Sequence, residues 1–406
     1  MKDERMNIIC IASEFKGGGF LEECQKAGWH VTLVTREKLL QNEWPWLALN
    51  EIKSVSDDAA PVDYVRAITE VAHERAPQRV VGLDEFDVLV AAQAREHLQL
   101  GGMSSTKALR FRDKLLMRNI ASRAGIACPD FTRVVNTDEI ANFAATVEPP
   151  WIVKPRYEVS AFGIRKVENA EQLWEVLADL ESRGNWRDHP SQFILEKFIA
   201  GDVFHVDSVV KEGVPVAYGV SSYGVPPMTV SHEGGVFSTS ICAYDSPERK
   251  DLEEINRQLI SAFELDRGVT HAEFLRGKED GKYYLLEVAC RVGGAYIANV
   301  LDAAGGFNLW REWARLEIET PENPYHPPKV QKGYAGVAVS LANTEFPDTS
   351  AYNDPEIVYR VSKPRHVGLI VRSDDHGRVK ELLYSYTERF SQDFLAVAPV
   401  KERYDD

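Results

Sequence analysis

The chain has 406 residues, and its 47 Lys and Arg against 62 Asp and Glu give a formal net charge of −15. Hydrophobic residues make up 44% and charged residues 27%, which excludes a disordered, coiled-coil or fibrous chain and predicts two to four globular domains. The acidic balance argues against a bulk nucleic-acid binder, because neutralised phosphates supply most of that affinity. We therefore expect no nucleic-acid partner.

The compartment is predicted from three features. No apolar run approaches the roughly 20 residues that a membrane helix needs. The first seven residues are too charged for a secretory signal. The five cysteines lack CxxC or zinc-site spacing. We expect a reduced, cytoplasmic protein that does not bind a membrane.

The N-terminal region alternates strand and helix patterns. Apolar runs predict strands at Asn7–Ala12, His30–Val34 and Arg79–Gly82, and Phe20–Ala27 predicts a helix. This order is typical of βαβ units with a parallel sheet. The three glycines at 17–19 lack GxGxxG spacing, so we interpret them as a tight strand-to-helix turn.

The middle of the chain begins with one predicted helix, from Ser104 or Ser105 to Gly125, with Asp113 and Lys114 inside it. Residues 231–235 are expected to form a polar loop. The remaining patterns predict strands at Trp151–Lys154, Phe193–Ile199 and Val203–Val210, helices at Ala170–Arg183 and from Ser246, and a hairpin of Val269–Leu275 with Lys282–Ala289.

The C-terminal region follows four prolines between Pro321 and Pro328, which predict a stiff linker. Beyond it, Gly333–Leu341 and Pro364–Arg372 predict strands and Gly377–Phe390 a helix. Just before the linker, Trp310 and Trp313 have the i, i+3 spacing of core or interface residues.

Chemistry is indicated first by the hairpin. A turn centred near Glu279 would place Glu287 opposite His271 and diagonal to Glu273, roughly 7–8 Å away. Two carboxylates at this spacing can converge on a hard divalent cation. A solvated sheet face is the alternative interpretation, but the apolar neighbours favour a metal site.

A second indication comes from lysines at strand ends. Lys154 ends one strand and Lys197 lies near the end of another, and a loop of small residues with Ser160 and Gly163 follows the first. Lysine charges combined with loop N–H groups that can approach oxygen atoms suit a polyphosphate.

In this order and spacing, residues 104–316 resemble the ATP-grasp superfamily, in particular its carboxylate–amine ligases of the L-amino acid or dipeptide type. The resemblance rests on Arg112-Asp113-Lys114, Val153-Lys154-Pro155, the run Glu196 to Gly201, Glu273-Phe274, and the run Glu287 to Gly294. It implies an α/β (α+β) ATP-grasp fold with an N-terminal pre-ATP-grasp α/β domain at 1–103, two grasp subdomains at 104–190 and 191–320, and a small C-terminal αβ lobe at 329–406.

The resemblance also implies ATP as co-substrate, Mg²⁺ or Mn²⁺ as cofactor, and a set of site residues. The implied ATP-binding residues are Lys114, Lys154, Ser160, Gly163, Glu196, Lys197, Phe198, Ile199 and Asp202. The implied metal ligands are Glu273 and Glu287, and the implied catalytic residues are Arg291 and Lys154. Candidates for substrate contact or for support of the metal ligands are His205, Asp207, His271, Gly293 and Gly294.

Three positions depart from the family pattern. Ala289 stands where members usually have Asn or Asp, so either one Mg²⁺ would lack a protein ligand, or water or His271 would compensate without binding the ion directly. Val203 stands where a ribose-binding acid is usual, which leaves Asp202 or Asp207 for that role. The phosphate loop has a single glycine, Gly163.

The resemblance implies an ATP-dependent ligase that forms an amide or peptide bond through an acyl phosphate, releasing ADP and phosphate. Its partners would be a small-molecule carboxylate and an amine, with a homodimer as an open alternative. A kinase-like or carboxylase-like enzyme without an amine acceptor, and a non-catalytic nucleotide-binding module, are the competing hypotheses.

Overall fold

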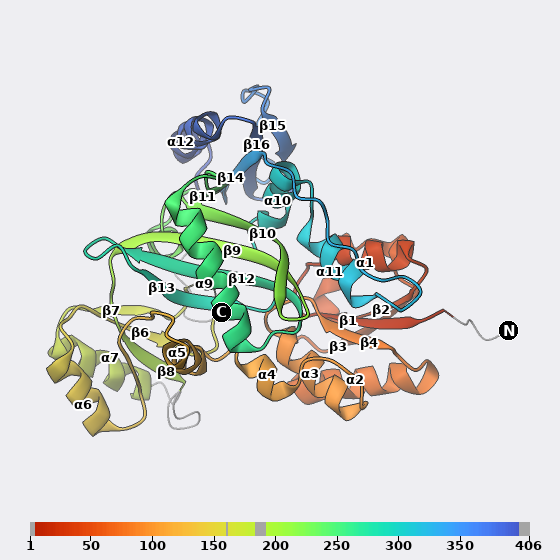
Figure 1. Cartoon of the computed structure of the whole chain (residues 1–406), viewed down its shortest axis with the longest axis horizontal. Coiled ribbons are helices and arrows are strands. Elements are labelled where there is room, and N and C mark those ends of the chain that lie inside the picture. The colour runs from red at the N-terminus through yellow and green to blue at the C-terminus, as the bar shows by residue number, and fades with distance from the viewer. Residues whose placement is uncertain (1–4, 160, 183–191, 398–406) are drawn as a thin grey trace.

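The computed structural model describes residues 5–159, 161–182 and 192–397. The strands form three sheets, with an N-terminal sheet on one side, a small antiparallel sheet on the other, and an eight-stranded sheet between them (Figure 1). The mixed α/β architecture agrees with the predicted fold class.

The N-terminal sheet is parallel, with strand order β3-β2-β1-β4. Gly17 has a φ of 84°, and a Cβ atom there would lie 2.6 Å from Leu83 Cδ1, so the glycine turn before the first helix has a steric reason. The elements are β1 (Asn7–Ala12), α1 (Gly18–Lys26), β2 (His30–Arg36), η1 (Glu37–Leu39), η2 (Trp46–Ala48), β3 (Glu51–Val55), α2 (Pro61–Glu74), β4 (Arg79–Gly82) and α3 (Asp87–His97).

The single helix predicted for residues 104–125 is wrong. The chain forms α4 (Ser105–Leu109) and α5 (Lys114–Arg123), with a break between them. Asp113 lies at the break and caps α5, because its carboxylate accepts a hydrogen bond from Leu115 N at 3.0 Å. Lys114 is therefore the first residue of a helix rather than an interior one.

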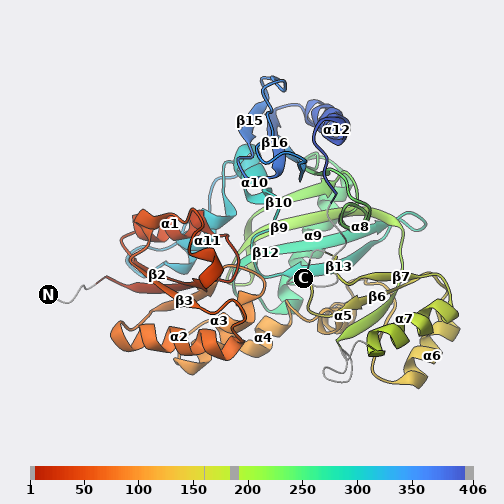
Figure 2. The ribbon, with the colours of Figure 1, turned by 180° about the vertical axis from the view of Figure 1, so that it is seen from behind.

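The small sheet has the order β5-β8-β6-β7. Side chains alternate along its strands: Trp151 and Val153 are buried with α6 and α7 on one face, whereas Ile152 and Lys154 point to the other. Figure 2 shows both helices on the outer side. The elements are β5 (Phe131–Arg133), α6 (Thr137–Thr146), β6 (Trp151–Pro155), β7 (Arg165–Val167), α7 (Ala170–Ser182) and β8 (Phe193–Lys197).

The eight-stranded sheet is antiparallel, with the order β13-β12-β9-β10-β11-β14-β16-β15. Its elements are β9 (Gly201–Lys211), β10 (Val214–Tyr223), α8 (Pro227–Glu233), β11 (Phe237–Ile241), α9 (Pro247–Phe263), β12 (Arg267–Gly277), β13 (Tyr283–Ala289), α10 (Ile297–Gly305), α11 (Leu309–Glu317), β14 (Tyr334–Leu341), β15 (Ile357–Arg360), β16 (His366–Ser373) and α12 (His376–Asp393). The prediction of a polar loop at 231–235 is wrong for residues 231–233. These residues end the short helix α8, which begins at Pro227 after the N-cap residue Pro226.

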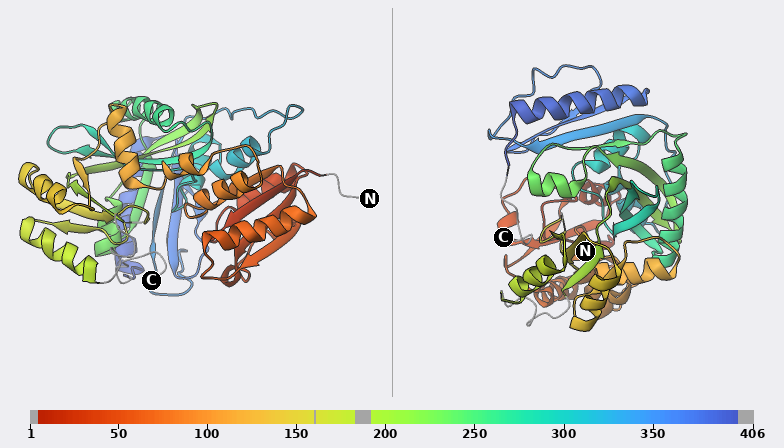
Figure 3. Two further views of the ribbon diagram at one scale, coloured as in Figure 1. Left: turned by 90° about the horizontal axis from the view of Figure 1, so that it is seen from below. Right: turned by 90° about the vertical axis from the view of Figure 1, so that its left-hand side faces the viewer.

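The C-terminal strands continue this large sheet, because β14 pairs with β11. Helix α12 covers one face of the added strands, as the right-hand view of Figure 3 shows. An aromatic cluster closes the contact, with Tyr386 and Phe390 of α12 packed against Tyr352. The segment after the proline-rich linker therefore shares its hydrogen-bonded sheet with the preceding grasp region.

Helix α11 joins the large sheet to the N-terminal region. The rings of Phe20 and Trp313 meet at a centroid distance of 5.1 Å, and Arg315 Nε donates to Glu23 at 2.6 Å. One hydrophobic core runs from the N-terminal strands through α11 to the large sheet. The packing expected of Trp313 is confirmed by its burial.

The state of the cysteines and the length of the helices both bear on the compartment that the sequence predicts. All five cysteines are free, and burial raises the pKa of Cys290 to about 12, so this thiol beside the predicted site carries no thiolate near neutral pH. Within the described ranges, no helix combines the length and the apolar character needed to cross a bilayer.

Candidate active site

A cavity of about 540 Å³ lies between the small sheet and the large sheet. Most of the predicted site residues line it, although they come from five separate stretches of the chain. The predicted residues on its wall are Lys114, Lys154, Glu196, Lys197, Phe198, Ile199, His271, Glu273, Glu287, Arg291 and Gly294.

The two predicted metal ligands lie directly opposite each other. Glu273 pairs with Glu287 across the β12–β13 hairpin, and His271 pairs with Ala289, so the predicted register with its diagonal carboxylates is wrong. Glu287 lies opposite a residue two positions from the one predicted. A bulge between Glu273 and Phe274 accounts for one of these positions, and a turn centred between Glu279 and Asp280 accounts for the other. Directly opposed Cβ atoms are roughly 4.5–5.5 Å apart, closer than the diagonal spacing, so the correction favours a shared cation.

Lys114 faces this pair from the start of α5. Its Nζ lies 3.2 Å from Glu287 Oε1 and donates to the carbonyl of Glu158 at 2.6 Å. It therefore places a positive charge between a predicted metal ligand and the loop that follows β6. Asp113, which caps the helix, is held in turn by Arg156 Nε at 2.7 Å.

Lys154 and Glu196 form a buried network with Arg118. Glu196 accepts from Arg118 Nε at 2.6 Å and pairs with Lys154 Nζ at 2.7 Å. Burial lowers the pKa of Lys154 to about 8, even though Glu196 opposes this shift. Burial alone would raise the pKa of Glu196, but Arg118 and Lys154 outweigh it and hold the carboxyl below its usual range. Both oxygens of the Glu196 carboxylate are thus paired with cations. The predicted adenine contact would therefore be made by the backbone of this strand.

Part of the cavity wall is apolar, and it includes residues that are predicted to contact adenine. Phe198 and Ile199 follow β8, and Val203 and Leu286 come from the large sheet. Lys166 Nζ lies 4.6 Å from the centroid of the Phe198 ring. An uncharged planar base fits between such walls because apolar contact needs no compensating charge.

Arg291 is held by an acid that was not among the predicted site residues. Glu85, which follows β4, pairs with Arg291 Nη2 at 2.9 Å and with Arg112 Nη1 at 2.6 Å. Burial would raise the pKa of Glu85, but Arg291 and Arg112 outweigh burial and lower it to about 2. The sequence does contain a signal that could have identified Glu85 as a site residue. Two adjacent acids, Asp84 and Glu85, follow a predicted parallel strand.

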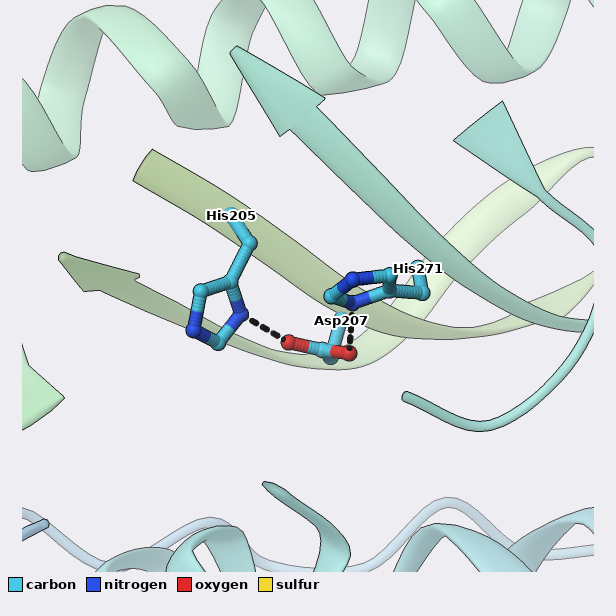
Figure 4. Close-up of side chains that lie close together, drawn as sticks. All are labelled: His205, Asp207 and His271. Carbon is cyan, nitrogen blue, oxygen red and sulfur yellow. Dashed lines mark hydrogen bonds and ion pairs between the residues drawn. The ribbon is translucent and has the colours of Figure 1, made fainter. Parts of the chain in front are cut away.

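His205, Asp207 and His271 form a buried chain of hydrogen bonds beside the glutamates (Figure 4). Asp207 accepts from His205 Nδ1 at 2.5 Å and from His271 Nδ1 at 2.8 Å. Burial lowers the pKa of His271, but Asp207 and Glu273 outweigh it and raise the pKa to about 9. On the far side, His271 Nε2 lies 3.4 Å from Glu273 Oε1, which also accepts from Tyr223 OH at 2.6 Å.

The other predicted residues that the structure describes are not among those on the cavity wall. Asp202 is exposed at the start of β9, and Asp207 is fully buried with both oxygens bonded to imidazoles. Gly163 lies in the loop after β6 with a φ of 66°, and Ser160 falls outside the described residues. The loop is also contacted by α8, where His232 Nε2 lies 3.2 Å from the carbonyl of Ala161.

Part of the chain that includes most of the cavity wall matches a known family profile. Residues 147–299 match the family profile described as ATP-grasp domain. This match covers less than half of the chain, and it agrees with the predicted ATP-grasp fold.

Several ligases are similar in sequence. An L-arginine-specific L-amino acid ligase of Bacillus subtilis is 23% identical over 273 residues, covering 66% of this chain and 65% of the relative. A D-alanine–D-alanine ligase of Aquifex aeolicus is 27% identical over 176 residues, covering 43% and 57%. The chain thus spans less than two thirds of the length of these curated relatives.

Solved structures show the same fold at low identity. The L-amino acid ligase from Bacillus licheniformis superimposes with a TM-score of 0.75 at 16% identity, covering 98% of this chain and 100% of that one. An N5-carboxyaminoimidazole ribonucleotide synthetase from Thermus thermophilus gives 0.69 at 17% identity, covering 97% and 99%.

We predict that Glu85→Gln destabilises the fold by roughly 3–5 kcal/mol, because it leaves Arg112 and Arg291 without their buried counter-ion. Since the pKa of Glu85 is depressed in the folded protein, its contribution is present above about pH 4.5 and fades as pH falls toward 2. Urea unfolding at pH 7 and pH 3 measures both effects, and the gap between wild type and variant should narrow at the lower pH.

Glu264→Gln is the matched control for Glu85→Gln. Glu264 also contacts two cations, Lys107 and Arg110, but its side chain is 55% exposed against 3% for Glu85. Exposed ion pairs contribute roughly 0–1 kcal/mol. Equal losses in the two variants would contradict the assignment of Glu85 as the buried anchor.

We also predict that Gly293→Ala destabilises the protein by about 1–3 kcal/mol. A Cβ atom there would lie 2.8 Å from Asp207 Oδ1 and 2.9 Å from His271 Nδ1, so the histidine chain must move. Gly294→Ala is the neighbouring control, because nothing lies within 4 Å of its Cβ position. Thermal unfolding of both variants tests this, and a Gly294→Ala loss as large as that of Gly293→Ala would contradict it.

Proposed function

We propose that the protein is an ATP-dependent carboxylate–amine ligase that forms an amide or peptide bond through an acyl phosphate. One observation carries the proposal. Glu273 and Glu287 oppose each other in a cavity that also holds Lys114, Lys154 and Arg291. Phosphoryl transfer depends on positioning and on charge neutralisation more than on a protein nucleophile, and this arrangement supplies both.

ATP would lie with its base against the apolar part of the cavity wall and its phosphates toward Lys114 and Lys154. Mg²⁺ or Mn²⁺ would be held by Glu273 and Glu287, whose opposed carboxylates fit a hard cation, and would neutralise the charge of the phosphates. Lys114 and Arg291 complete that neutralisation from two other elements. Asp113 and Glu85 hold these cations in place through the helix cap and the buried ion pair.

The reaction would proceed in two steps. A substrate carboxylate oxygen attacks the γ-phosphorus, the bond to the bridging oxygen breaks, and ADP leaves. The neutral amine then attacks the acyl carbon, phosphate departs with the electrons of the carbon–oxygen bond, and the nitrogen gives up a proton to the departing phosphate. Phosphate replaces a hydroxide leaving group, which explains the use of ATP. Arg291 would stabilise the transferred phosphoryl group in both steps.

Amino acids are the substrate class that we propose for both positions. The similar ligases of Bacillus subtilis and Aquifex aeolicus bear names that specify amino acid substrates, which supports this choice. We also propose a cytoplasmic location, in keeping with five free thiols. A homodimer stays a prediction.

The function is tested by incubating the protein with ATP, Mg²⁺ and pooled amino acids, measuring ADP and analysing products by mass. The expected product has the summed mass of two amino acids less water, and ADP forms only when both are present. ADP release without an amine would support the kinase-like or carboxylase-like alternative. ATP binding without ADP release would support the nucleotide-binding module.

We predict that Glu287→Gln lowers the rate of ADP formation by at least about 100-fold, because it removes a charge that holds the cation neutralising the phosphates. Glu279→Gln, in the exposed turn of the same hairpin, is the control and should retain the wild-type rate. Steady-state ADP release measures both. A Glu287→Gln variant as active as the control would overturn the metal assignment.

A further inference from the structure

We propose that His271 is a third protein ligand of the divalent cation, beside Glu273 and Glu287, and that its nitrogen makes the site prefer Mn²⁺ over Mg²⁺. This inference rests on the proposed binding of a cation with ATP. It adds a ligand to that site and assigns a reason to the buried histidine chain beneath it.

The position of His271 is the first argument. His271 and Glu273 lie two residues apart on β12, so their side chains share a face of the sheet, and Glu287 reaches the same face from β13. All three line the cavity, which gives an entering cation access to each. The residue opposite His271 is Ala289, whose methyl group is small and offers no donor atom that could compete for the cation.

The distances are the second argument. His271 Nε2 lies 3.4 Å from Glu273 Oε1. Adjacent ligands of an octahedral ion with bonds near 2.1 Å are about 3 Å apart, so a small movement brings both atoms into one coordination shell. Tyr223 OH contacts the same two atoms, at 2.6 Å from Glu273 Oε1 and 3.4 Å from His271 Nε2. The two donor atoms therefore both contact the Tyr223 hydroxyl, and a cation bound to them would take the place of that hydroxyl.

The third argument is the support behind the imidazole. Histidines that bind metals typically donate their other ring N–H to a carboxylate, which fixes the ring and its tautomer. Asp207 Oδ1 does this for His271 Nδ1 at 2.8 Å (Figure 4). Nε2 is thereby directed at the cavity, and any proton it carries leaves when a cation binds.

Asp207 is itself fixed by the second histidine. Its other oxygen accepts from His205 Nδ1 at 2.5 Å, and His205 Nε2 lies 2.7 Å from Thr239 Oγ1. The donor atoms of His205, Asp207 and His271 lie within 4.8 Å of one another, which could suggest a separate metal site. Because both Nδ1 atoms already bond to the carboxylate between them, we assign His205 and Asp207 as positioning residues for His271.

The ligand chemistry sets the expected selectivity. Mg²⁺ is a hard cation that prefers an all-oxygen shell with near-ideal octahedral geometry. A nitrogen ligand suits transition metals better, so one imidazole with two carboxylates favours Mn²⁺.

The test uses the full chain with Mn²⁺ and a non-hydrolysable ATP analogue, examined by electron spin-echo envelope modulation. We expect ¹⁴N modulation that disappears when the protein is labelled with ¹⁵N-histidine, and that is lost in His271→Gln but retained in His326→Gln, an exposed control. Wild-type modulation that does not change on histidine labelling would overturn the proposal, whether or not the variants fold.

Calorimetric titration with Mn²⁺ and with Mg²⁺ gives a second readout. We expect His271→Gln and Asp207→Asn to weaken Mn²⁺ binding by about 10–100-fold, with a smaller effect on Mg²⁺. Equal losses for both cations would contradict the proposed selectivity. Neither measurement needs turnover, so a histidine-coupled Mn²⁺ signal without any ligase product would refute the proposed function and leave this inference standing.

Discussion

Glu85 accepts hydrogen bonds from two arginines that belong to different parts of the chain. Arg112 precedes α5, and Arg291 follows the hairpin that holds the two opposed glutamates. Burying an unpaired carboxylate costs folding free energy, and burying two unpaired guanidinium groups does the same. Each of the three charges is therefore stable in the interior only because the others are present. This interaction fixes the N-terminal sheet against the cavity and sets the position of Arg291, the cation that we place at the transferred phosphoryl group.

The same rule governs the rest of the cavity. Lys154 and Arg118 are buried because Glu196 lies between them, and Lys114 is buried beside Glu287. These pairs arrange positive charge on the walls before any nucleotide binds. A polyphosphate with its cation would then meet groups whose positions are already set, and such preorganisation is the main source of electrostatic catalysis.

The histidine chain extends this support beneath the sheet surface. Asp207 is fully buried, yet both of its oxygens are bonded, and Gly293 is the residue that leaves room for the Asp207–His271 contact. The segment after Arg291 and the strand that carries Glu273 therefore meet at a point where no larger side chain fits. The ligand geometry of the proposed cation site depends on this contact as well as on the glutamates.

Several features of the site could be predicted from the sequence because they depend on local pattern. Strand runs with a lysine at the end, the placement of Glu273 and Glu287 on neighbouring strands, and the order of the motifs all lie along the chain, and they led to the ATP-grasp fold. The turn at Gly17 was also predictable, since a strand, glycines and a helix follow one another there. Each of these follows from side-chain alternation, turn chemistry or motif order, which neighbouring residues determine.

The tertiary structure decided what depends on contacts between distant residues. The bulge after Glu273 and the position of the turn together moved the partner of Glu287 by two residues from the one predicted, because strand pairing responds to packing on both faces of the sheet. The helix break at Asp113 depends on Arg156, 43 positions later, and the role of Glu85 depends on Arg291, 206 positions later. The sequence by itself therefore determined the fold and the candidate site residues, whereas only the folded chain determined which charges neutralise one another, because partners for buried charges are set by proximity in space.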